Sequence, residues 1–108
     1  MTTIINLTPH AISLYNTRTG AYDTIAPSGT LARVSSTTVS CGTVGDYALT
    51  TTSYGAVEGL PDPQPDTIYV VSSLVAQRVP NRADVFVPNE SVRDEQGRII
   101  GCKSLGRI

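Results

Sequence analysis

Residues 67–79 read TIYVVSSLVAQRV and contain the most apolar run of the chain. The first five of these residues are mostly β-branched or aromatic, which is typical of a strand buried on both faces. Either Ser72 or Ser73 can cap a short helix over residues 74–78, because a serine hydroxyl accepts a hydrogen bond from a free backbone N–H of the first turn. The segment therefore predicts a central strand followed by one short helix.

The rest of the chain predicts further short strands separated by turns. Residues 59–66 contain three prolines within five positions, and proline has no N–H to donate, so we expect a stiff connector outside the sheet. Residues 35–46 are polar and contain glycine, and we expect a loop or an irregular strand there. Strands are expected at 4–7, 30–34, 47–51 and 84–87, the last closed by Pro88-Asn89, with a turn near 53–55 and hairpins over 11–25 and 92–102.

The length of 108 residues predicts a single domain that spans 1–108. The elements sum to a mainly β fold, a small and mostly antiparallel barrel or a twisted sheet with one short helix; an α+β arrangement is the alternative. Fourteen residues are threonine, which suits the exposed face of a strand. A weakly charged, Thr-rich surface does little to keep strand edges from pairing. We therefore expect a homo-oligomer in which a second copy covers the edges.

The charge and cysteine content exclude several classes of partner. The formal net charge is −1, which gives the chain no electrostatic reason to bind nucleic acid or an anionic membrane. No stretch approaches the ~18 consecutive apolar residues of a membrane-spanning helix. Cys41 and Cys102 are too few for a disulfide framework or a cysteine-based zinc site. We expect both thiols to be free in a reducing cytoplasm.

The sequence offers no conventional catalytic set. His10 is the single histidine, which disfavours mechanisms that need two imidazoles, and zinc sites that need three or four good ligands. The glycine-rich phosphate-binding and dinucleotide-binding motifs and the GxSxG nucleophile motif are also missing from the sequence. Cys102 lies at the end of an apolar strand, where a free cysteine usually acts as a small buried hydrophobe. We assign no catalytic residue, no metal ligand and no cofactor.

Arginine supplies seven of the eight cationic side chains, and its planar fork suits phosphate or carboxylate. Arg82 and Arg93 flank the strand expected at 84–87. Because such a strand spans roughly 17 Å, the two arginines would flank a large ligand or act across an interface between two copies. The helix start at Ser72 is a second place that favours an anion; a capped helix with nothing bound is the alternative. The candidate ligand-binding residues are His10, Arg33, Tyr69, Ser72, Arg82, Asp84 and Arg93.

The stretch NLTPH at residues 6–10 leaves two interpretations of His10 open. In the first, Thr8 and Pro9 form a corner, and the imidazole stabilises it through hydrogen bonds to nearby backbone. In the second, the imidazole lines a pocket and donates to an anionic or base-like ligand.

Six landmarks stand out along the chain: INLTPH at 5–10, PSGTLARV at 27–34, YGAVEGLP at 54–61, TIYVVSSLVAQRV at 67–79, RADVFVPN at 82–89 and VRDEQGRIIGCKSL at 92–105. Together they resemble a family of small uncharacterised proteins encoded by bacteriophages and prophages. The resemblance covers nearly the whole chain and implies a soluble phage protein made in the cytoplasm of the bacterial host; it implies no established activity. In relatives of that family the segment after the position of Pro88 often carries glycines in place of residues 89–91.

Three functions stay open at this point. The first is a phage-encoded cytoplasmic binding protein that sequesters a small anionic or nucleotide-like signal of host immunity, an anti-defence sponge. The second is a structural, virion-associated or protein-binding accessory module, which the weakly charged surface favours. The third is a small enzyme that cleaves a nucleotide signal with His10 as general acid or base.

Overall fold

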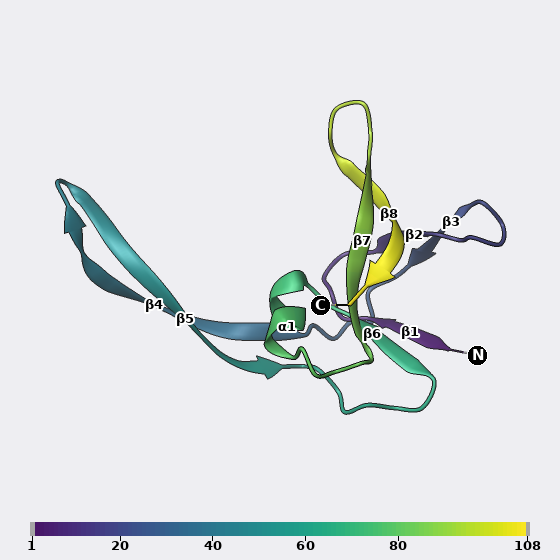
Figure 1. The fold of residues 1–108 in the computed structure, drawn as a ribbon, viewed down its shortest axis with the longest axis horizontal. Helices are drawn as coiled ribbons and strands as arrows, with labels where there is room; N and C mark the ends of the chain where they lie inside the picture. Colours follow the sequence, from purple (N-terminus) through teal and green to yellow (C-terminus); the bar gives the residue numbers. More distant parts are fainter. Residues whose placement is uncertain (1, 108) are drawn as a thin grey trace.

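The computed structural model describes residues 2–107, and its main body is one six-stranded sheet in the order β1-β6-β7-β8-β2-β3. The sheet is barrel-like and nearly closed, and the expected mainly β fold with one short helix is confirmed (Figure 1). An isolated bridge between Asn6 and Pro27 links the chain after β3 back to β1 and almost closes the ring. The strands are β1 Thr3–Asn6, β2 Ile12–Tyr15, β3 Tyr22–Ile25, β6 Thr67–Val70, β7 Val85–Arg93 and β8 Ile99–Gly106.

The segment that starts at residue 67 forms a buried strand with a neighbour on each side, followed by a short helix, as predicted; in the sheet order this strand lies next to the end strand β1. Strand β6 pairs in parallel with β1 on one side and with β7 on the other. Helix α1, Ser73–Arg78, follows it, and the Ser72 hydroxyl accepts a hydrogen bond of 3.4 Å from the N–H of Val75. Parallel neighbours need a long crossover, and α1 with its flanking loops provides that crossover between β6 and β7.

Strand pairing in the molecule is half parallel and half antiparallel. The hairpins β2–β3 and β7–β8 are antiparallel, as is a third hairpin of β4, Arg33–Val44, and β5, Tyr47–Glu58. The pairs β1–β6, β6–β7 and β2–β8 are parallel. Turn residues in the sequence can reveal only the antiparallel pairs, because a short turn joins two consecutive strands and forces them to run in opposite directions. The expectation of mostly antiparallel pairing therefore held for strands joined by a short turn, and it missed the parallel pairs, including β6 with β7.

Strand β7 is longer than predicted, because Pro88 and Asn89 do not end it. Pro88 lies opposite Leu105 of β8. Strand β6 reaches only as far as Val70, which pairs with Phe86, so β7 has a single neighbour at residue 88. A proline is tolerated there because one side of the strand needs no donor.

The core lies on both faces of the sheet, as the alternation of β6 requires. Tyr69 and Val71 pack with Val75 of α1 on one face. Val70 packs with Ile12 and Cys102 on the other. Helix α1 therefore covers the first face only. On the second face the core is formed by side chains of the sheet itself, with Ile12 from β2 and Cys102 from β8.

A long two-stranded hairpin projects from the α1 side of the body; we call it the arm. It consists of β4, Arg33–Val44, and β5, Tyr47–Glu58. Of the loop or irregular strand expected at 35–46, the irregular strand is what forms, with register shifts after Val34 and after Ser40. The turn expected near 53–55 is wrong: the chain turns at Gly45, whose φ is 58°. Residue Gly42 does not break β4, because it follows a bulge in the ladder. Threonine and valine supply the strand propensity that the polarity of this segment concealed.

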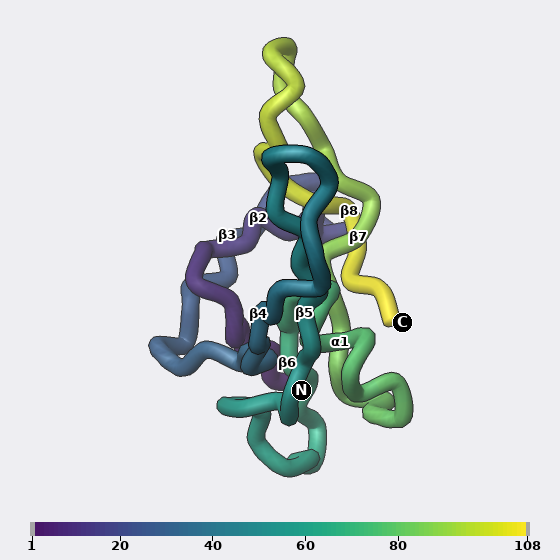
Figure 2. Tube along the Cα trace, turned by 90° about the vertical axis from the view of Figure 1, so that its left-hand side faces the viewer, coloured from purple at the N-terminus to yellow at the C-terminus, as the bar shows by residue number. Residues whose placement is uncertain are grey.

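The arm makes the molecule elongated. It extends far from the sheet in Figure 1 and stands in front of the body in Figure 2. The Cα radius of gyration is 17.0 Å, whereas a compact chain of this length would have about 13 Å. Only the base of the arm is anchored: Val34 and Val57 pack against the core beside α1, and the Arg78 guanidinium donates to the Tyr54 carbonyl over 3.3 Å.

Candidate functional site

The corner at residues 6–10 is held by Asn6 and not by the imidazole of His10. Asn6 is 1% exposed. Its Nδ2 donates to the carbonyls of His10 (2.8 Å) and Ile25 (3.1 Å), and its Oδ1 accepts from the N–H and the hydroxyl of Thr8, at 3.0 Å and 2.6 Å. Both donors and both acceptor positions of the amide are thus used. The His10 side chain is exposed, and within residues 2–107 no hydrogen bond of the imidazole is found.

Asn6 was missed by the sequence reasoning, although a signal was present. An asparagine just before Thr-Pro can accept hydrogen bonds from residues two further on. The sequence could not reveal the hydrogen bond that the Asn6 amide donates to the carbonyl of Ile25, at the end of β3. Asn6 therefore ties β1 to the hairpin that follows the corner.

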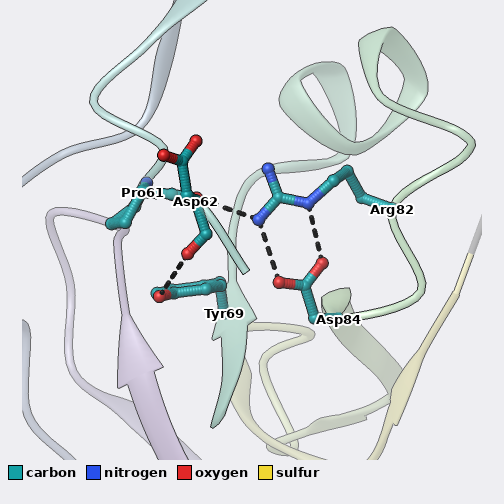
Figure 3. Close-up of polar contacts among 5 residues, drawn as sticks. All are labelled: Pro61, Asp62, Tyr69, Arg82 and Asp84. Atoms are coloured by element: carbon teal, nitrogen blue, oxygen red, sulfur yellow. Dashed lines mark hydrogen bonds and ion pairs between the residues drawn. The ribbon is translucent and has the colours of Figure 1, made fainter. Parts of the chain in front are cut away.

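Arg82 and Asp84 form a bidentate pair that fastens the 59–66 connector to the body (Figure 3). Arg82 donates through Nε and Nη2 to the two carboxylate oxygens of Asp84, each over 2.9 Å. Nη2 also donates to the carbonyl of Pro61 over 2.9 Å, and the Tyr69 hydroxyl donates to the carbonyl of Asp62 over 3.2 Å. The hydrogen bond with Arg82 lowers the pKa of the Asp84 carboxyl. The same bond raises the pKa of Arg82.

The seven predicted site residues do not form one cluster. Tyr69, Arg82 and Asp84 come together, but Tyr69 is buried in the core and the ion pair is internally satisfied. Ser72 spends its hydroxyl on the cap of α1. Two other positions lie apart from that cluster: Arg33 faces Glu58 at 3.9 Å at the base of the arm, and Arg93 donates to the Gly97 carbonyl over 2.7 Å in the β7–β8 hairpin.

The arm has two chemically different faces. Residues opposite each other in an antiparallel pair share a face, and the face alternates along each strand. Val44 lies opposite Tyr47, Val39 opposite Thr51, and Leu49 opposite the small Gly42. The bulge after Ser40 keeps these three pairs on the same side. The four large apolar side chains, which we call the apolar arm face, are Val39, Val44, Tyr47 and Leu49, exposed by 49%, 60%, 76% and 42%.

The opposite face of the arm carries mostly small side chains with hydroxyl groups, apart from Tyr54, which lies opposite Ser36 near the base. Thr38 lies opposite Thr52, with their hydroxyls 3.3 Å apart, and Ser40 lies opposite Thr50. Asp46 at the turn is the single charged residue between 34 and 57. The sequence did not predict that the arm has one apolar and one polar face, because this depends on where the turn and the bulge lie.

A second surface feature is an apolar groove on the body, which we call the β2–β8 groove. It has a volume of about 210 Å³ and is lined by Ile12 of β2, Pro88 of β7, and Ile99, Ile100 and Cys102 of β8, with small uncharged neighbours. Burial raises the pKa of the Cys102 thiol, which keeps it protonated and unreactive at neutral pH. The volume lies below the ~300 Å³ at which small-molecule sites usually begin, so the groove suits a protein side chain better.

The part of the chain that the structure describes holds no helix with the length and apolar character needed to cross a membrane. Comparisons with protein-family models, with curated proteins and with solved structures find no match for this chain. The function is therefore argued from the arm, the groove and the contacts of the arginines.

Proposed function

We propose that the protein is a protein-binding accessory module that acts through its arm. The observation that carries this proposal is the apolar arm face, which nothing in residues 2–107 covers. A two-stranded hairpin alone is at best marginally stable in water. An arm that exposes four large apolar side chains gains stability when a protein surface removes them from water.

The edges of the arm support the same function. In the described chain β4 and β5 pair only with each other, so each presents an unpaired row of backbone donors and acceptors. Proteins usually block such edges with lysine, proline or inward charges. Residues 34–57 contain none of these except Asp46 at the turn, which favours an arm that is used for association.

Sequestration of a small anionic or nucleotide-like signal, in a phage protein of the bacterial cytoplasm, stays a prediction from the sequence. The arginine contacts favour it less than protein binding. Arg82 is engaged by Asp84 and Pro61, and Arg93 by Gly97. An anionic ligand would have to displace the intramolecular partners of these two arginines.

The test uses a tagged full-length chain produced in bacteria together with an untagged copy. The variant Tyr47→Thr with Leu49→Thr removes apolar surface while keeping strand propensity. Ala48→Thr is the matched control, because residue 48 points to the other face of the same strand. We expect the control to retain a co-purifying protein, either the untagged copy or another chain, that the double variant loses. Identical co-purification by both variants would overturn the proposed function.

A further inference from the structure

We infer that the arm docks on a second copy of this chain, with the apolar arm face of each copy seated on the β2–β8 groove of the other. This inference rests on the proposed function and names its partner. Three observations carry it: the position of the groove relative to the arm, the charge of the two surfaces and the area that they offer.

The arm of a chain does not reach its own groove. Val34 and Val57 at the base of the arm pack into the core cluster of α1, on one face of the sheet. Ile12 and Cys102, which line the groove, belong to the cluster on the other face. The arm leaves the body on the α1 side and points away from β2 and β8 (Figure 1). An arm can therefore fill only the groove of another copy.

The two surfaces match in charge and polarity. The arm carries no charge between residues 34 and 45 or between residues 47 and 57. No charged side chain lines the groove, and two of its lining residues, Ile99 and Ile100, are more than half exposed. Neutral apolar surfaces meet without like-charge repulsion and without the desolvation of unpaired charges. A basic or acidic partner would gain little from either surface.

The available area favours reciprocal exchange over contact between two arms. Beyond its anchored base the arm runs from the Ser36–Tyr54 pair to the Val44–Tyr47 pair, a ribbon about 30 Å long and about 10 Å wide, so one face offers about 300 Å². Two arms packed face to face would bury about 600 Å² in total, no more than a crystal-packing contact. Two arms on two bodies would bury about 1,200 Å², the lower end of the range for specific interfaces. The symmetric exchange also closes the assembly as a dimer.

The experiment measures the mass of the untagged full-length protein by light scattering and by sedimentation over a concentration series. Interfaces at the lower end of the specific size range are often weak, so the series extends to about 100 μM, at which we expect a dimer. The arm variant Tyr47→Thr with Leu49→Thr and the groove variant Ile99→Thr with Ile100→Thr should each weaken the dimer by about 100-fold or more, the loss expected for buried apolar anchors. The controls are Ala48→Thr on the arm and Lys103→Thr, an exposed position of β8. Both controls should remain dimers.

Each outcome decides between the inference and the function on which it rests. If the wild-type chain stays monomeric, the inference that the partner is a second copy is overturned. The proposed function then survives only if the co-purification shows another protein retained through the apolar arm face. A dimer that survives the groove substitutions but not the arm substitutions places the two arms against each other and overturns the groove as docking surface. All substituted side chains are exposed, so every variant is expected to fold. Circular dichroism of each variant checks that it does.

Discussion

Replacement of Asn6 by alanine should destabilise the protein more than any change at His10. The Asn6 amide makes four hydrogen bonds, to two carbonyls and to two groups of Thr8. At ~1 kcal/mol of net stability for each bond, their loss amounts to ~4 kcal/mol. The Thr8 hydroxyl lies 3.0 Å from the His10 carbonyl and can turn its proton there, which recovers ~1 kcal/mol. The expected net loss is therefore about 3 kcal/mol.

Urea unfolding followed by circular dichroism measures this loss. With a slope of ~1.5 kcal/mol per M, the midpoint should fall by about 2 M, and Tm should fall by about 15 °C for a domain of this size. His10→Ala is the control in the same corner. The imidazole is exposed and makes no hydrogen bond within the described residues, so its removal should change the free energy of unfolding by less than ~0.5 kcal/mol.

The reverse ranking would refute this account of the corner. A His10→Ala midpoint as low as that of Asn6→Ala would mean that the imidazole holds the corner. A shift of less than about 0.5 M for Asn6→Ala would mean that water replaces the amide at little loss of stability.

Three further expectations rest on single contacts. Gly59→Ala should lower Tm by about 10 °C or more, because φ is 82° and the added Cβ would collide with a backbone carbonyl; an unchanged melting curve would contradict the observed backbone. The Asp84 pKa is lowered by Arg82, so this pair stabilises the protein above the ordinary aspartate pKa and loses that contribution as pH falls through the native value; urea titrations of the wild type and Asp84→Asn should therefore converge at acidic pH. A thiol reagent should label exposed Cys41 in the native state and buried Cys102 only after unfolding; equal labelling rates would contradict the burial.

Within the body, local signals predicted the elements in which sequence neighbours contact each other; in the arm they placed the turn wrongly. The apolar run at 67–71 became β6, Ser72 became the cap of α1, and the two turn-rich segments became the β2–β3 and β7–β8 hairpins. The parallel pairs lay beyond such signals, because β1 meets β6 across some sixty residues. Those contacts are selected by burial of Tyr69 and Val70, which sequence periodicity cannot assign to a particular neighbour.

The candidate site was harder to predict, because residue type does not reveal the partner of a side chain. Arg82 has the chemistry of an anion-binding residue, but Asp84 two positions later already occupies its fork. Tyr69 has the chemistry of a stacking face, but the core encloses it. In both cases tertiary structure supplied an intramolecular partner for a group that the sequence offered to a ligand.

The arm reverses this pattern, because its apolar side chains lack a partner in the described chain, although the sequence predicted only a loop or an irregular strand at 35–46 and a short strand at 47–51. Natural chains seldom leave a long, neutral strand pair with one apolar face uncovered, because such edges aggregate. The single turn at Gly45 and the bulge after Ser40 align Val39, Val44 and Leu49 on that face. A shift of the register by one residue would scatter them over both faces. The alignment that the bulge preserves is therefore what an arm built for a binding surface requires and what a simple connecting loop would not need.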